Sequence, residues 1–164
     1  MRYRILAVLS VLALAGGVMV VGAQQAGAQQ EFTLIAHQTN FVFAPVNGSP
    51  TSNPGPGTPP PETGDRFIVR EALSQNGVVV GYDNIICTDT FNNNGLCDVV
   101  FAITNKGDIH GTALVRDLFD FSSNGPTVFD GDIDGGTFAY ANATGSAHLT
   151  TLPDGDTQDT FLIN

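Results

Sequence analysis

The sequence has little positive charge, no tryptophan and only two cysteines. Its 164 residues hold 6 Lys and Arg against 16 Asp and Glu, which gives a net charge of −10. A surface this acidic repels the phosphate backbone of nucleic acids, and it repels anionic lipid headgroups for the same reason. We therefore expect neither a nucleic acid nor a membrane surface as a partner of the mature protein.

The chain also lacks the short motifs that place phosphates, dinucleotides or an activated serine in an active site. It has no phosphate-binding loop, no G-x-G-x-x-G after a strand and no G-x-S-x-G. The three histidines, His37, His110 and His148, are dispersed without the spacing of metal ligands. The sequence therefore predicts no cofactor.

Residues 130–135 resemble part of a calcium-binding loop. Asp130, Asp132 and Asp134 alternate before Gly135, as in the first half of an EF-hand loop. The bidentate glutamate that such a loop requires would fall on Ala141. We expect alternate acids that face solvent, and no metal site.

Residues 1–28 have the features of a removable signal peptide. Arg2 and Arg4 precede the apolar run Ile5–Val21, and Ala26-Gly27-Ala28 is a small-x-small cleavage site. The alternative is an uncleaved anchor, because the run nearly reaches the ~18 residues that span a bilayer. We expect cleavage and a secreted protein of residues 29–164, which has a net charge of −12 because two arginines leave with the signal.

Both cysteines, Cys87 and Cys97, lie in this exported part and flank a polar segment between two apolar runs. In an oxidising compartment, two cysteines around a turn predict a disulfide that closes a hairpin. A redox or metal role would need a second thiol motif or a histidine cluster, and the sequence has neither.

Period-2 alternation and turn residues predict eight strands and no amphipathic helix. Asn76-Gly77 and Gly135-Gly136 indicate tight hairpin turns. Residues 44–64, with seven prolines and four glycines, predict a long exposed loop. The expected strands are 31–43, 66–75, 78–88, 97–104, 109–115, 127–133, 137–152 and 157–163.

Eight sequential strands with short turns favour a single all-β domain, an eight-stranded antiparallel up-and-down barrel. A two-sheet sandwich is the alternative. The interior of an eight-stranded barrel is either filled by side chains or holds one small ligand.

The expected strand 137–152 sorts its residues by size. If its small face (Ala139, Ala141, Ala143, Gly145, Ala147) points inward, bulk is missing and a cavity forms. If Phe138 and Tyr140 point inward, the interior is filled. A cavity below the ~300 Å³ usual for ligand pockets would favour a filled barrel.

A series of residues over about 64–163 resembles the dirigent and allene-oxide-cyclase-like barrels, most closely their exported bacterial members. Its most specific part is GGTFAYANATG, which aligns with the family hairpin motif GGTG-x-[FY]-x-x-A-x-G. Phe138 replaces the fourth glycine, and Thr144 stands where an arginine is common. The matching positions are Gly64-Asp65-x-Phe67-x-Val69, Leu73, Gly77, Val80-Gly81, Cys87, Cys97, Gly107-x-Ile109, Gly111, Gly135-Gly136-Thr137, Tyr140, Ala143 and Gly145. The resemblance implies a barrel fold and, as an activity, a cofactor-free cyclase or isomerase, or a protein that directs stereochemistry.

Five strand residues are candidates for a site in such a barrel. Glu71 and Asp83 are the catalytic candidates, because a carboxylate on a half-buried strand is costly unless it is paired. Tyr82, His110 and Tyr140 are candidates for lining a cavity. Since Tyr82 and Asp83 are adjacent, at most one of them faces inward. Each of the five has the alternative of pointing outward into water.

The direction in which Arg66 and Arg70 point limits the charge that a buried ligand can carry. Arg66 and Arg70 share one strand face, and Phe67 and Val69 share the other. With the apolar face inward, the arginines point to water or across a subunit interface, and a buried anion would have no counter-charge. We therefore expect a small neutral, apolar ligand, such as a polyketide-, terpene- or phenol-like molecule.

Two functions remain open from the sequence. In the first, a secreted barrel binds this small molecule and orients or cyclises it. In the second, a non-catalytic exported barrel acts through its outer surface or as a homo-oligomer.

Overall fold

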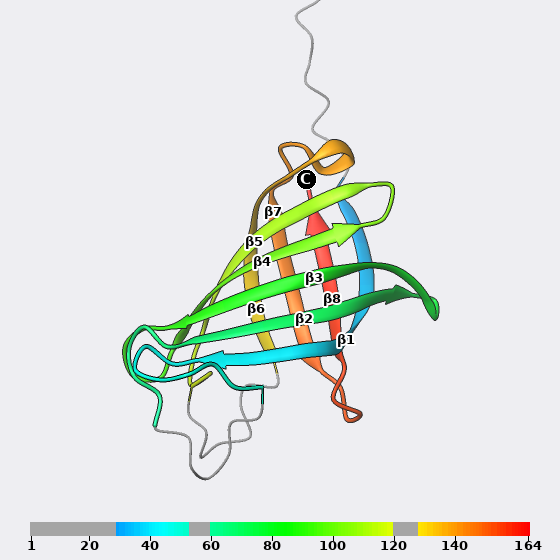
Figure 1. The fold of residues 1–164 in the computed structure, drawn as a ribbon. Helices are drawn as coiled ribbons and strands as arrows, with labels where there is room; N and C mark the ends of the chain where they lie inside the picture. The colour runs from blue at the N-terminus through cyan, green and yellow to red at the C-terminus, as the bar shows by residue number, and fades with distance from the viewer. Residues whose placement is uncertain (1–28, 53–59, 120–127) are drawn as a thin grey trace, which may run out of the picture.

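In the computed structural model, which describes residues 29–52, 60–119 and 128–164, the chain forms a closed barrel (Figure 1). Each strand pairs antiparallel with the next, and β8 pairs with β1. The up-and-down barrel predicted from the sequence is confirmed. Its strands are β1 (Gln30–Ala44), β2 (Arg66–Gln75), β3 (Val78–Asp89), β4 (Gly95–Ile103), β5 (Gly107–Val115), β6 (Val128–Gly136), β7 (Gly145–Thr151) and β8 (Thr157–Ile163).

Helical structure is confined, within these ranges, to the short 3-10 helix η1 (Phe138–Tyr140). Among the same residues, no helix has the length and apolar character needed to cross a membrane. Asn76 and Gly77 both have positive φ, 52° and 76°, and form the predicted tight turn between β2 and β3.

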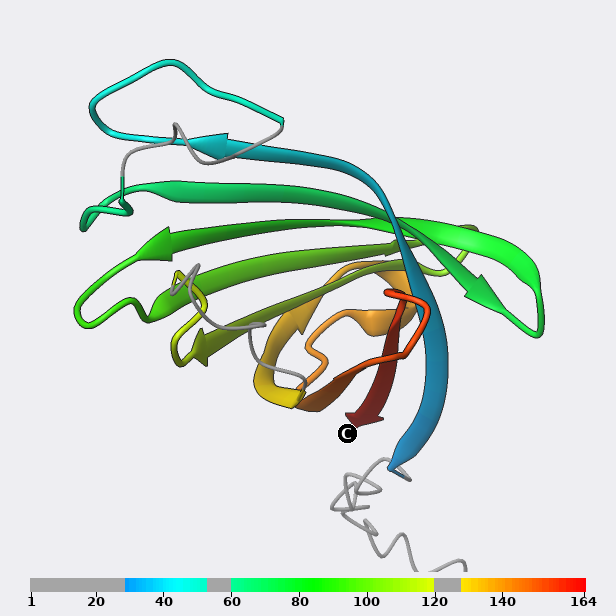
Figure 2. The ribbon, with the colours of Figure 1, turned by 90° about the horizontal axis from the view of Figure 1, so that it is seen from below.

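Strand β1 closes the barrel. Its first half, Gln30–Ala36, pairs with β8, and its second half, Ile35–Ala44, pairs with β2. The register with β2 shifts between Gln38 and Asn40. Such a bulge bends a strand, and Figure 2 shows β1 curving from the side of β8 to the side of β2.

The two described ends of the loop 44–64 are held against the barrel. Thr51 pairs with Phe43 at the end of β1. The buried Asp65 carboxylate accepts hydrogen bonds from the backbone N–H groups of Val46, at 2.7 Å, and Glu62, at 2.8 Å. Residues 53–59 of this loop lie outside the described residues, as does the predicted signal peptide 1–28.

The interior side chains form two apolar clusters, one toward each end of the barrel. In the first, Phe101 meets Phe161 edge to face at 4.8 Å between ring centroids. In the second, Phe67 stacks on Phe119 at 4.4 Å. The first cluster contains Leu34, Ala36, Leu73, Phe101, Ile103, Ile109, Ile133, Tyr140, Ala143, Ala147, Leu149, Phe161 and Ile163. The second contains Phe43, Phe67, Cys87, Cys97, Val115 and Phe119.

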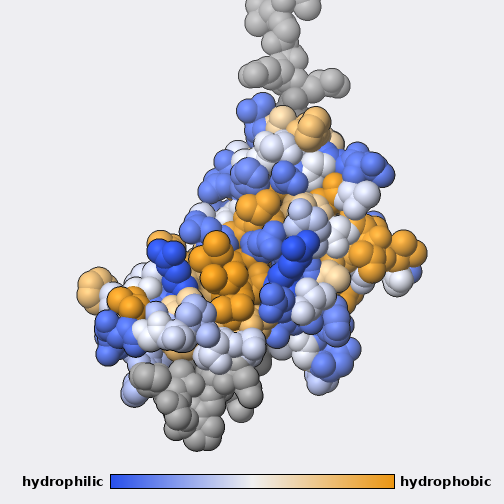
Figure 3. Space-filling model, viewed as in Figure 1, coloured by the Kyte–Doolittle hydropathy of each residue, from blue (hydrophilic) through white to orange (hydrophobic). Residues whose placement is uncertain are grey.

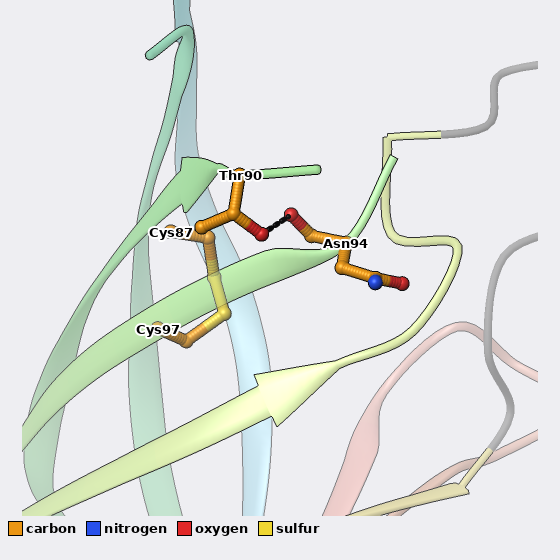
Figure 4. Close-up of a disulfide and its surroundings, with 4 residues drawn as sticks. All are labelled: Cys87, Thr90, Asn94 and Cys97. Atoms are coloured by element: carbon orange, nitrogen blue, oxygen red, sulfur yellow. Dashed lines mark hydrogen bonds between the residues drawn. A yellow bond between two sulfur atoms is a disulfide. The ribbon is translucent and has the colours of Figure 1, made fainter. Parts of the chain in front are cut away.

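Cys87 and Cys97 form the predicted disulfide (Figure 4). They lie directly opposite each other in the β3–β4 register. Beyond them, the Thr90 hydroxyl donates to the Asn94 carbonyl at 3.0 Å and tightens the connection between the two strands. Such a bond is compatible with an oxidising, extracellular location.

The predicted turn at Gly135-Gly136 and the first half of the predicted strand 137–152 are wrong, whereas its second half is β7. Strand β6 continues through Gly136, which pairs with Ile109 of β5. The chain then turns through η1, where Phe138 has a φ of 50°, and through Asn142, whose φ is 65°. Left-handed residues interrupt an extended chain, so β7 begins only at Gly145.

The size sorting along 137–152 therefore does not describe two strand faces. Ala143 and Ala147 are buried, whereas Ala139 and Ala141 are exposed. Phe138 is 86% exposed. Neither face points inward as a whole, because the first half of the segment is a turn.

The two glycines at the end of β6 should respond differently to substitution. A Cβ at Gly136 would lie 2.5 Å from the backbone oxygens of Asp108 and Tyr140, whereas a Cβ at Gly135 would meet nothing within 4 Å. We expect Gly136→Ala to lower the free energy of unfolding by about 1 to 3 kcal/mol, as overpacking does. Gly135→Ala is the matched control and should change it by less than about 0.5 kcal/mol. Urea unfolding of both variants tests this, and equal effects would contradict it.

Candidate functional site

Three carboxyl side chains lie inside the barrel: Glu71 on β2, Asp83 on β3 and Asp159 on β8. Asp83 and Asp159 are fully buried, and Glu71 is 8% exposed. Glu71 and Asp83 are direct partners in the β2–β3 register. On β2, Glu71 stands between Phe67 of the second apolar cluster and Leu73 of the first. We call Glu71, Asp83 and Asp159 the carboxyl layer.

The carboxyl layer is not neutralised by basic side chains. The buried charged residues in the described part of the chain are all acidic: Asp65, Glu71, Asp83, Asp89 and Asp159. Both carboxyl oxygens of Asp159 have no hydrogen-bond partner there, and Asp83 has only the neighbouring Glu71 carboxyl, with which it shares a side-chain hydrogen bond that raises the pKa of Asp83. Within the same ranges, no three acidic, histidine or cysteine side chains are arranged to hold a metal ion.

Burial makes these groups reluctant to ionise. Desolvation, followed by the negative charges of Glu71 and Asp159, raises the pKa of Asp83 to about 9. Desolvation, followed by the charge of Glu71, raises the pKa of Asp159 to about 8. Desolvation also raises the pKa of Glu71. At neutral pH Asp83 and Asp159 therefore hold their protons, and a protonated carboxyl donates a hydrogen bond.

A cavity of about 240 Å³ lies beside this layer, and Glu71 forms part of its wall. The volume is below the ~300 Å³ usual for ligand pockets. It exceeds the roughly 150 Å³ of an apolar cavity that binds benzene. The apolar part of its wall comes from β1 to β7 and the segment after β5: Phe41, Phe67, Val69, Ile85, Cys87, Cys97, Val99, Phe101, Ala113, Val115, Leu118, Phe129, Ile133, Ala147 and Leu149.

Of the adjacent pair Tyr82 and Asp83, the carboxylate faces inward. Tyr82 is on the outer surface, 42% exposed, and the Arg70 guanidinium lies 4.3 Å from its ring centroid. Tyr82 therefore does not line the cavity. Arg66 and Arg70 are both exposed, as expected from the alternation of β2.

His110 and Tyr140 also lie away from the cavity wall. His110 is half-buried and alternates with the buried residues Ile109 and Gly111, so it faces outward. Tyr140 is buried in the first apolar cluster, with its ring centroid 6.3 Å from that of Phe32. It closes one end of the barrel, because η1 folds over that end (Figure 1).

The other two histidines are paired with acids on the outer surface. His37 contacts Asp156, and His148 contacts Asp130, each at 2.6 Å. Asp130, Asp132 and Asp134 are exposed, which is the arrangement expected for alternate acids on one strand face.

Asp159 is the member of the carboxyl layer that sequence reasoning missed. It shares a strand face with Phe161 and Ile163, which are both buried. An acid in line with two large apolar residues at alternate positions was the available signal.

No family model matches the chain, and no curated protein matches it either. Solved structures do match. That of pyocyanin demethylase aligns over 82% of this chain and 100% of its own, with a TM-score of 0.64 and 22% identity. That of the pterocarpan synthase dirigent protein aligns over 94% of this chain and 96% of its own, with a TM-score of 0.48 and 18% identity.

The fold is shared. The likeness to pyocyanin demethylase shows a common barrel, and at this identity it shows nothing of activity. The similarity to the pterocarpan synthase dirigent protein is weaker, and no argument rests on it. The barrel implied by the resemblance to dirigent and allene-oxide-cyclase-like proteins is thus present.

The carboxyl layer should make stability fall as pH rises. In the unfolded chain Asp159 ionises near its ordinary pKa of 3.8, whereas the folded protein keeps this proton up to about pH 8. Between these values the unfolded state is favoured by about 1.4 kcal/mol per pH unit for each such carboxyl. Asp159→Asn should therefore flatten the slope and raise stability at pH 7.

Urea unfolding between about pH 5 and pH 8 measures this slope. The control is Asp98→Asn, because Asp98 is exposed on the outer face of β4. Identical slopes for the wild type and Asp159→Asn would show that Asp159 is ionised in the folded protein.

Proposed function

We propose that this protein is a secreted barrel that binds a small apolar molecule in its cavity and orients it against the carboxyl of Glu71. One observation carries the proposal: a cavity with an apolar wall contains a buried carboxyl that has no basic partner. An interior that served only for stability would be expected to be filled with apolar side chains, because buried unpaired acids cost free energy.

The cavity limits the size of the ligand. Its volume of about 240 Å³ suits a molecule of one or two fused rings and excludes long chains. Aromatic side chains on three strands, Phe41, Phe67 and Phe101, would hold such a ring by dispersion and stacking. Confinement of this kind fixes one conformer of a reactive molecule.

The chemistry available in this cavity is proton transfer. When it is protonated, the Glu71 carboxyl can protonate an oxygen or a double bond of the bound molecule, and the carboxylate that results can take a proton back from another position. A cofactor-free isomerisation or cyclisation needs no more than this exchange. The name pyocyanin demethylase supports the idea that a barrel of this shape can act on a small molecule.

Filling the cavity should abolish binding. Val99 lines the cavity, whereas its neighbour Val100 is on the outer face and 37% exposed. We expect Val99→Phe to weaken the binding of naphthalene at least about tenfold, and Val100→Phe to leave it within about twofold. Naphthalene fluorescence measures this with little background, because the chain has no tryptophan. Absence of naphthalene binding by the wild type would contradict the proposal.

A second candidate function is self-association through the outer surface. Exposed apolar side chains gather over β2 to β5, where Figure 3 shows an apolar patch at the centre of the face. The cavity volume below the usual range favours this candidate as well. The outward residues of this face are Ile68, Ile86, Leu96, Val100 and Leu114.

Charge on the same face suits a second copy of the chain. Arg66 and Arg70, two of the four basic residues of 29–164, flank the patch on β2, and Asp98 lies opposite Ile86 in the β3–β4 register. In a symmetric pair, the arginines of one copy would face the carboxylate of the other. Elsewhere an acidic surface repels a second copy.

Sedimentation velocity at several protein concentrations tests self-association. Ile86→Lys places a charge in the patch and should shift the protein toward monomer at least about tenfold in dissociation constant. Val78→Lys is the control, since Val78 is 65% exposed at the β2–β3 turn, away from the patch. A wild-type protein that is monomeric at every concentration would remove this candidate.

A further inference from the structure

We infer that the ligand of the cavity carries a basic nitrogen, as a nitrogen heterocycle or an amine does, and that Glu71 binds this nitrogen. The inference rests on the proposed function and specifies the class of molecule. It starts from a mismatch inside the barrel, where three carboxyls are buried and no basic side chain of the described chain is buried with them.

The mismatch is one of hydrogen bonding as well as of charge. The two carboxyl oxygens of Asp159 have no partner among the residues that the structure describes, and Asp83 has only the neighbouring carboxyl of Glu71. Buried polar atoms are nearly always hydrogen-bonded, and each exception calls for an explanation. The interior supplies no base for these acids, and a ligand in the cavity can supply one to Glu71.

Glu71 is the member of the layer that can touch this ligand. It is in the cavity wall, whereas Asp83 and Asp159 are not among the lining residues. Asp83 is its register partner on β3. Asp159 is close enough for the charge of Glu71 to raise its pKa. The two aspartates therefore lie behind Glu71 and do not contact the ligand.

The interaction of Glu71 with the nitrogen involves one proton and no other reactant. The O–H of Glu71 donates to the nitrogen lone pair, and where the nitrogen is the stronger base the proton moves to it. The products are then an N–H cation and a carboxylate, which hold each other by a charge-assisted hydrogen bond. No other reactant is consumed.

The surroundings favour such a cation over an anion. None of the described residues that line the cavity is a lysine, arginine or histidine, so an anion would have no counter-charge there, whereas a cation can pair with Glu71. His37 is outside the barrel, 70% exposed and engaged with Asp156, and its charge lowers the pKa of Glu71 by less than desolvation raises it. A base is therefore favoured over a neutral hydrocarbon of the same shape, and an acid is disfavoured.

Naphthalene and isoquinoline test the inference, because the two molecules share one shape and differ by a ring nitrogen. We expect isoquinoline to bind the wild type at least about tenfold more tightly than naphthalene does, measured by titration at pH 7. Glu71→Gln should weaken isoquinoline binding at least about tenfold and leave naphthalene binding within about twofold. Asp98→Asn, on the outer surface, should change neither.

The absorption spectrum of bound isoquinoline provides a second readout, since its protonated and neutral forms absorb differently. A cation or a shifted spectrum in the wild type that is lost in Glu71→Gln would support the contact. Equal affinity for the two molecules, or equal losses in Glu71→Gln, would overturn the inference and leave the proposed function standing. If neither molecule binds, the proposed function fails.

Discussion

The structure depends on one strand that hydrogen-bonds on two sides. β1 pairs with β8 over its first half and with β2 over its second, and the bulge between Gln38 and Asn40 gives it the bend to do so. Without this closure the sheet would have two unpaired edges, which are sites for aggregation. Closure also creates an interior in which side chains are buried, and the unusual properties of the carboxyl layer follow from that burial.

Closure therefore couples the fold to the site. Inward positions on β2, β3 and β8 are buried because the neighbouring strands are all paired, and this burial raises the pKa values of Glu71, Asp83 and Asp159. The layer divides the apolar interior into two clusters, and the cavity lies beside it. Burying these acids lowers the free energy of unfolding. Such a cost is expected at a functional site and not in an interior that serves only for packing.

Much of the fold followed from local signals, because alternation and turn residues act over a few positions. The Asn76-Gly77 turn, the Cys87–Cys97 pair and seven of the eight strands are of this kind. Gly135-Gly136 shows the limit. A glycine pair looks the same whether it makes a turn or admits a close backbone contact, and here Gly136 makes room for the oxygens of Asp108 and Tyr140.

The site was less predictable, since it depends on which strands face one another across the barrel. Alternation implied that only one of Tyr82 and Asp83 points inward, but it did not say which one. That Asp159 of β8 would approach Glu71 of β2 depends on closure through β1, and no local pattern contains this. Long-range proximity is a property of the whole barrel.

The position of the disulfide has a consequence for its chemistry. Cys87 and Cys97 are 6% and 5% exposed, and both are in the cavity wall. Reduction of a disulfide requires a thiolate to approach one sulfur directly, and a protein reductant cannot bring its active site into a space of about 240 Å³. Only small thiols that enter the cavity can reach this bond, so an occupied cavity would also shield the covalent link that holds its own wall together.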